Sequence, residues 1–187
     1  AAPNAIINSW WDFGHWFKTI GGRAVTFDGG SQNSPMAHWI GKALSTDDEQ
    51  EAIGILRMLD CGSRKGFETF ATYLQEGDET IRPETTVEGI HHMDELLLIW
   101  DVDEAKEYLV DEAGLTGAQA DEVLALTHCT PPENYFITSQ DMVGKAGVWG
   151  HFGTWDFEKA YVYSVLRKGR ADQAIPEIEA ISGLDEE

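Results

Sequence analysis

The stretch "SWWDFGHWF", Ser9 to Phe17, is crowded with aromatic residues and places Asp12 directly after two adjacent tryptophans. Apolar side chains continue through it at spacings of three and four, which predicts a helix over Trp10–Ile20. A pair of glycines then ends this helix. The side chains that form its apolar face, and that we expect in the core, are Phe13, Trp16, Phe17 and Ile20.

Trp10, Trp11 and Asp12 admit two interpretations. In the first, the indoles are core side chains and the carboxylate of Asp12 caps the helix. In the second, two indole N–H donors and one carboxylate form a compact site for a hydroxyl group, which donates to the carboxylate and accepts from an indole. Consecutive helical residues diverge by about 100°, so the three side chains converge most easily where the helix is not yet regular.

The segments around this helix predict a mixed fold. Short strands are expected at residues 4–8, in "RAVTFDGG" at 23–30 and in "NYFITS" at 134–139. A short helix is expected in "PMAHWIGKAL" at 35–44. Amphipathic helices follow, the first capped by Thr46 with Glu49 and burying Ile53, Leu56 and Leu59; the others lie at 66–74, 84–100, 103–114 and, capped by Thr116, 116–128. The order indicates an α+β fold: a predominantly α-helical single globular domain with a few short strands.

A second unusual segment begins at Asp141 with "DMVGKAGVW". Glycine recurs at every third position through residue 153, which predicts an irregular or kinked helix unless the glycines permit close backbone approach. Asp141 and Lys145 have the i,i+4 spacing of a surface ion pair. Met142, Lys145 and Trp149 share a face of the same helix. Since this segment and the tryptophan pair lie at opposite ends of the chain, they are free to meet in space.

Composition excludes several kinds of partner. The 187 residues carry a net charge of −20, and residues 44–130 alone hold 21 acidic and five basic groups, a net of −16. Nucleic acid is therefore not an expected partner, because phosphate binding needs a basic face. The acidity is explained by solubility or a saline environment; a cation-binding cluster would need ligand spacings that the sequence lacks. No metal site, phosphate loop or apolar run long enough to cross a bilayer is predicted.

Two cysteines, Cys61 and Cys129, are 68 positions apart, so neither a zinc ribbon nor a redox pair is predicted. Each ends a helix-like stretch. They are either two buried thiols or a disulfide that closes a long loop and requires an oxidising compartment. The residues alone leave both possibilities open.

Three segments together resemble one family. "WWDFG" is similar to the WWDxG signature of the oligosaccharyltransferase catalytic subunit, which N-glycosylates Asn-X-Ser/Thr sequons, and "RAVTFDGGSQN" resembles the segment after that signature. "SQDMVGKAGVWGHFGTWDF", residues 139–157, resembles the archaeal members, of the AglB type. The resemblance is anchored at both ends and covers most of the chain.

The resemblance implies a division of labour. Residues 1–187 correspond to the C-terminal globular (central core) domain of a larger membrane enzyme, on the extracytoplasmic face, with a frayed tail at 176–187. No catalytic residue and no cofactor is expected on this chain. The divalent metal, Mg or Mn, and most contacts to the lipid-linked oligosaccharide of dolichol-phosphate type belong to the N-terminal transmembrane region. The isolated domain is therefore expected to be inactive, and its outward location would permit a Cys61–Cys129 disulfide.

By the same resemblance, Trp10, Trp11 and Asp12 form the pocket for the Ser or Thr at sequon position +2. A second family motif completes it, and two registers remain open: Asp141 with Lys145, or Met142, Lys145 and Trp149, of which we favour the second.

Two other functions compete with sequon recognition. A carbohydrate-binding module would use Trp10, Trp11 and Trp16 as stacking faces. A structural interaction domain would bury both adjacent indoles and leave Asp12 as a cap.

Overall fold

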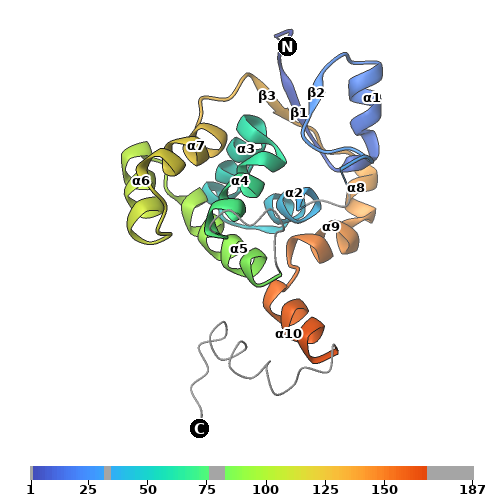
Figure 1. Ribbon diagram of the computed structural model, residues 1–187. Coiled ribbons are helices and arrows are strands. Elements are labelled where there is room, and N and C mark those ends of the chain that lie inside the picture. The colour runs from blue at the N-terminus through green and yellow to red at the C-terminus, as the bar shows by residue number, and fades with distance from the viewer. Residues whose placement is uncertain (1, 32–34, 76–82, 168–187) are drawn as a thin grey trace.

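The computed structural model describes residues 2–31, 35–75 and 83–167, so the tail expected at 176–187 lies outside the described residues. Three short strands, β1 (Ile6–Asn8), β2 (Ala24–Val25) and β3 (Asn134–Phe136), form a parallel sheet in the order β2-β1-β3. Ile6 pairs with Ala24 on one side and with Asn134 on the other. The sheet therefore places the first strand of the chain beside residues 134–136, which lie far along the sequence, as Figure 1 shows.

The helix expected at Trp10–Ile20 forms as a 3₁₀ turn, η1 (Trp11–Phe13), followed by α1 (Gly14–Thr19). The core assignment of its apolar face is wrong, since Trp16 is 59% exposed and Ile20 is 75% exposed. Phe13 and Phe17 are half-buried and lie outside the core cluster. Apolar spacing defines a face but not what covers it, and this six-residue helix lies at the edge of the molecule.

Helix α2 (Met36–Ser45) lies between the helical block and α9 (Ala146–Gly153), as Figure 1 shows. Its residues from Met36 to Gly41 are all buried, because neighbours surround its first turns on several sides. The helical block consists of α3 (Glu49–Gly62), α4 (Arg64–Leu74), α5 (Pro83–Leu98), α6 (Val102–Asp111) and α7 (Gly117–Thr127).

The start of α3 differs from the prediction. Asp48, not Thr46, is the N-cap, and its side chain accepts from the backbone N–H groups of Gln50 and Glu51. The buried face shifts with it: Ile53 is 41% exposed, Leu56 is half-buried, and the buried positions are Ile55, Met58 and Leu59. Aspartate competes well with threonine as a cap, and the start of the helix sets which side chains face α5. The predicted Thr116 cap of α7 is confirmed, with Gln119 completing a capping box.

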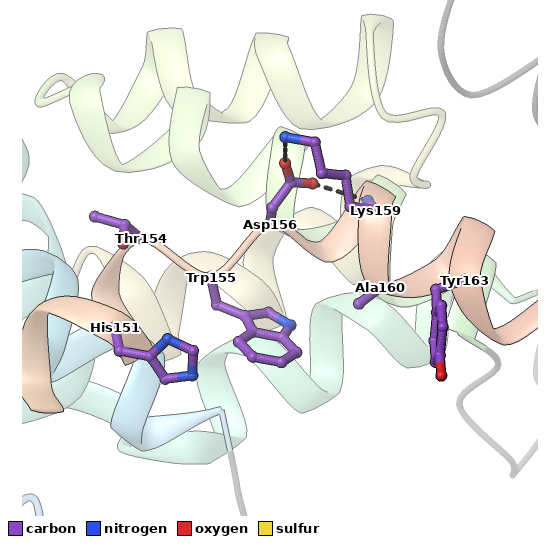
Figure 2. A pocket seen from close by; sticks show the side chains of 7 residues that line it. All are labelled: His151, Thr154, Trp155, Asp156, Lys159, Ala160 and Tyr163. Carbon is purple, nitrogen blue, oxygen red and sulfur yellow. Dashed lines mark hydrogen bonds and ion pairs between the residues drawn. The ribbon is translucent and has the colours of Figure 1, made fainter.

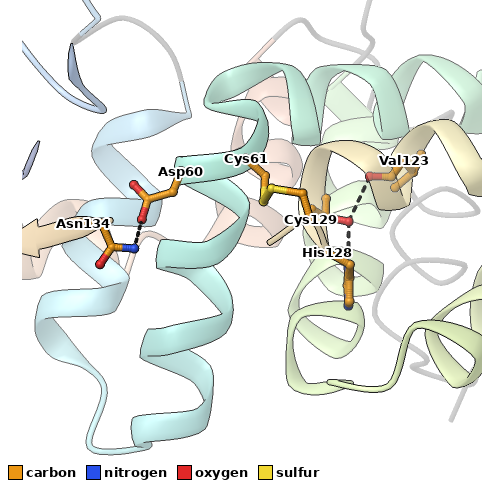
Figure 3. Close-up of a disulfide and its surroundings, with 7 residues drawn as sticks. Asp60, Cys61, Val123, His128, Cys129 and Asn134 are labelled. Carbon is orange, nitrogen blue, oxygen red and sulfur yellow. Dashed lines mark hydrogen bonds between the residues drawn. A yellow bond between two sulfur atoms is a disulfide. The ribbon is translucent and has the colours of Figure 1, made fainter. Parts of the chain in front are cut away.

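Cys61 and Cys129 form a disulfide that ties the end of α3 to the segment after α7 (Figure 3). Beside it, the buried carboxylate of Asp60 accepts from Asn8 Nδ2 at 2.8 Å and from Asn134 Nδ2 at 2.6 Å. Burial raises the pKa of Asp60 to about 6. The disulfide and this carboxylate together fasten the sheet to the helical block.

The glycine-rich segment is broken, as predicted. It forms α8 (Gln140–Gly144) and α9 (Ala146–Gly153), separated at Lys145, and α10 (Phe157–Arg167) follows.

The fold class is confirmed, since the described residues are mostly helical and the strands are few and short. In that part of the chain we find no helix with the length and apolarity needed to cross a membrane.

Candidate functional site

The sheet brings the two unusual segments together. The backbone N–H of Ile137 donates to Asn8 O at 2.8 Å, which extends the β1–β3 pairing to the residue before Ser9. The hydroxyl of Ser9 donates to Ile137 O at 2.8 Å and lies 3.9 Å from Met142 Sδ. The WWD segment, which starts one residue later, is therefore held against the start of α8.

Gly14 fixes how the WWD turn lies on the second strand. A Cβ atom at this position would stand 2.4 Å from Phe27 O and 2.6 Å from Asp28 Cβ. No side chain fits at such distances, so the backbone of the turn packs directly on the residues after β2. The glycine of "WWDFG" is thus required by packing, independently of any ligand.

Lys145 joins the two segments through charge. Its Nζ donates to Asp12 Oδ1 and, at 3.0 Å, to Asp141 Oδ2. These hydrogen bonds, that to Asp12 first, raise the pKa of Lys145 above its usual value. The pKa of Asp141 is lowered, chiefly by the Ser139 hydroxyl and then by Lys145. One ammonium from the helix break thus bridges two carboxylates.

Asp12 is not a helix cap, because Trp10 occupies the N-cap position of η1 and no side chain bonds to that helix start. The Asp12 side chain is 19% exposed. Its Oδ2 is buried, and within the described residues it has no hydrogen-bond partner. A buried carboxylate oxygen without a donor is costly, so Asp12 retains the capacity to accept from a hydroxyl or amide group.

The two adjacent tryptophans have different environments. Trp10 is 1% exposed and packs against Phe27 and Phe152, with ring centroids 5.2 Å and 6.1 Å away. It is a core residue and cannot offer a stacking face to a ligand, which removes one platform of the carbohydrate-binding alternative. Trp11 is partly buried against the core, and Trp16 is exposed on α1. The core interpretation therefore holds for Trp10, whereas Asp12 belongs to the charged cluster.

The break between α8 and α9 contains both registers of the second motif. Met142 is 4% exposed, and the indole N–H of Trp149 donates to its carbonyl at 2.8 Å, which closes the break from the core side. Asp141 lies on the solvent side and pairs with Lys145. The structure brings all four side chains to one place, with Met142 beneath and Lys145 at the surface.

No three His, Cys, Asp or Glu side chains gather as a metal site in residues 2–31, 35–75 and 83–167. His91 Nε2 lies 3.2 Å from Glu158 Oε1, and the Glu95 carboxylate accepts from the Tyr108 hydroxyl at 2.7 Å, so the histidine and Glu95 have separate partners. What the described arrangement offers chemically is a set of polar groups: the Asp12 carboxylate oxygen, the Lys145 ammonium and the indole of Trp11, which is partly buried against the core.

Ser9 was missed by sequence reasoning, although it is 4% exposed and its hydroxyl bonds across the junction of the two segments. The sequence feature that could have identified Ser9 is a small polar residue at the end of an apolar strand. Such a residue needs a hydrogen-bond partner when it is buried.

Two archaeal proteins, each named dolichyl-phosphooligosaccharide-protein glycotransferase, are similar to the chain. The protein from Methanocaldococcus jannaschii is 36% identical over 155 residues, and that from Methanococcus voltae is 36% identical over 156 residues. Each match covers 82% of this chain, which spans only 16% of the relative's length. No family model matches the chain, and no solved structure matches it significantly. The family resemblance predicted from the motifs is thereby confirmed.

Proposed function

Because the chain is homologous to one segment of the archaeal dolichyl-phosphooligosaccharide-protein glycotransferases, we propose that it recognises the acceptor sequon for a membrane oligosaccharyltransferase. That enzyme transfers oligosaccharide from a dolichol-phosphate type carrier to the asparagine of Asn-X-Ser/Thr. In this proposal the chain is the C-terminal globular domain on the extracytoplasmic face. The N-terminal transmembrane region holds the divalent metal, Mg or Mn, and performs the transfer.

The observation that carries the proposal is the meeting of Asp12 with Lys145, across 133 positions of sequence. A Ser or Thr hydroxyl both donates and accepts. It would donate to Asp12 Oδ2, the buried oxygen without a partner among the described residues, and accept from Lys145 or the Trp11 indole N–H. Because Oδ2 is covered, binding requires the Asp12 or Lys145 side chain to rotate.

The remaining candidates would support this contact. Trp10, which is buried, would form the floor from the core side, and Met142 and Trp149 hold the helix break from which Lys145 projects. The aliphatic stem of Lys145 would contact the methyl group of an acceptor threonine. A site built around a hydroxyl should reject Ala or Val at position +2 much more strongly than it separates Ser from Thr.

The test is acceptor kinetics in the full-length transferase. We expect Asp12→Ala and Trp11→Ala to raise the acceptor KM by about tenfold or more, since each removes binding energy for the +2 residue. Trp16→Ala is the matched control, because this indole is exposed on α1 and lies outside the cluster. Acceptor KM values that stay unchanged in both Asp12→Ala and Trp11→Ala would refute the proposal. Asp12→Asn, which keeps the shape, separates loss of charge from loss of fold.

A further inference from the structure

A separate pocket lies where α9 ends and α10 begins (Figure 2). Its volume is about 510 Å³, the size of a small-molecule site. Two aromatic side chains line it, Trp155, which is 43% exposed, and Tyr163, which is 64% exposed. In Figure 2 the small side chain of Ala160 lies between the two rings. The pocket thus presents two uncovered aromatic surfaces with an open space above a small residue.

The orientation of the indole is fixed by a neighbour. The His151 ring stands at 88° to the Trp155 ring, with centroids 5.2 Å apart. Such an edge-to-face contact is a preferred aromatic geometry and limits rotation of the exposed indole. A ligand that stacks on Trp155 would therefore meet a surface that is already in place, which lowers the entropy cost of binding.

Asp156 and Lys159 also border the pocket, and in Figure 2 their charged ends lie on the other side of the chain from the Trp155 and Tyr163 rings. The carboxylate of Asp156 accepts from the backbone N–H of Lys159 at 2.8 Å, and its other oxygen lies 2.7 Å from Lys159 Nζ. Because each is held by the other, the acceptor and the donor keep a defined position at the start of α10. Both groups retain hydrogen-bonding capacity toward a ligand, since a carboxylate has about four acceptor sites and an ammonium has three donors.

We propose that this pocket binds a sugar ring of the oligosaccharide that the enzyme transfers, a reading that rests on the proposed function. A pyranose has an apolar C–H face, which suits Trp155 and Tyr163, and a rim of hydroxyls, which can extend to the border of the pocket where Asp156 and Lys159 lie.

The position of the pocket agrees with that ligand. Helix α9, eight residues long, separates it from Lys145 and spans about 12 Å at 1.5 Å per residue. An asparagine two positions before the hydroxyl-bearing residue stands about 7 Å from it in an extended peptide. A glycan on that asparagine would therefore reach the pocket within its first few sugars.

The test uses the 187-residue chain with ¹⁵N label and methyl glycosides of glucose, galactose, mannose and N-acetylglucosamine. The probe is the Trp155 indole N–H signal, assigned by its loss in Trp155→Phe. We expect at least one glycoside to shift this signal saturably with a Kd of about 1–20 mM, as for a single open subsite. Tyr163→Ala should weaken the binding by about fivefold or more, as an aromatic anchor does.

Trp100→Ala is the matched control, because Trp100 is 51% exposed and lines a different pocket with Glu49, Gln50 and Ile53. A shift of the Trp155 signal that survives Trp100→Ala and is weakened in Tyr163→Ala supports the inference. A flat Trp155 signal with all four glycosides, or equal loss in both variants, overturns it.

The two proposals fail separately. Asp12→Ala should raise the acceptor KM and leave the glycoside shift intact, whereas Trp155→Ala should leave the acceptor preference for Ser or Thr at +2 intact. If the glycosides cause no shift but the acceptor kinetics change as expected, only the pocket assignment is wrong. If only the sequon arm fails, the chain binds sugar without recognising the acceptor.

Discussion

Asp12 and Asp60 show two ways in which this molecule holds a buried carboxylate. Asp60 faces two amide donors, Asn8 and Asn134, and serves to join β1 and β3 to α3. Asp12 faces an ammonium on one oxygen and, within the described residues, has no partner on the other. The first is a saturated structural contact. The second leaves one oxygen able to accept a hydrogen bond, which is the basis of the role that we propose for Asp12.

At the residue scale, the burial of His38 predicts that the free energy of unfolding depends on pH. Its Nδ1 lies 3.0 Å from Phe152 O, and burial lowers its pKa to about 4. The unfolded chain therefore takes up the proton at higher pH than the folded chain does. We expect the free energy of unfolding to fall as the pH drops from 6.5 toward 4, by up to roughly 3 kcal/mol from this residue.

His38→Phe should flatten that decline, as measured by urea unfolding at pH 7, 5.5 and 4. Some slope should remain, because burial also lowers the pKa of His128 to about 4. A decline in His38→Phe as steep as that of the parent chain would contradict the assignment.

At the scale of elements, helices α2 and α9 contact each other through glycine residues. A Cβ atom on Gly153 would stand 2.3 Å from the carbonyl carbon of Gly41, whereas one on Gly150 would meet nothing within 4 Å. The glycine repeat thus has two functions: it allows close approach at Gly153, and it weakens the helix elsewhere. This contact sets the position of α9 and, through it, of Lys145.

Gly153→Ala should lower the free energy of unfolding by about 1–3 kcal/mol, as overpacking does in cores. Gly150→Ala is its matched control and should raise stability by up to about 1 kcal/mol, because alanine is the better helix former. Thermal unfolding of the two variants checks this. The packing argument fails if Gly153→Ala is as stable as Gly150→Ala.

The whole molecule is closed by the Cys61–Cys129 disulfide, across a sequence separation of 68. Replacing both cysteines with serine should cost about 4 kcal/mol in the chain-entropy model and lower the Tm by roughly 10 °C. Differential scanning calorimetry measures the change, and a reductant should lower the Tm of the parent chain but not of the double variant. Equal Tm values for parent and variant would show that the loop is held by packing alone.

Much of the fold could be predicted from the sequence, because local signals are strong where helices are long and capped. The helical block, the Thr116 cap and the break near Lys145 follow from periodicity, capping chemistry and glycine spacing. The start of α3 and the exposure of Trp16 could not be predicted in this way. Each depends on which neighbour covers a face, and spacing along one helix carries no such information.

The sequence by itself determined the family resemblance, the mostly helical fold and the identity of the two segments that make the candidate site. Only the tertiary structure decided that they meet, since Asp12 and Lys145 are joined by a parallel pairing of β1 with β3. It also decided that Trp10 is core, that the cysteines are bonded and that Trp155 and Tyr163 border one pocket. The physical reason is that local propensity acts over a few residues, whereas burial and pairing depend on contacts between distant ones.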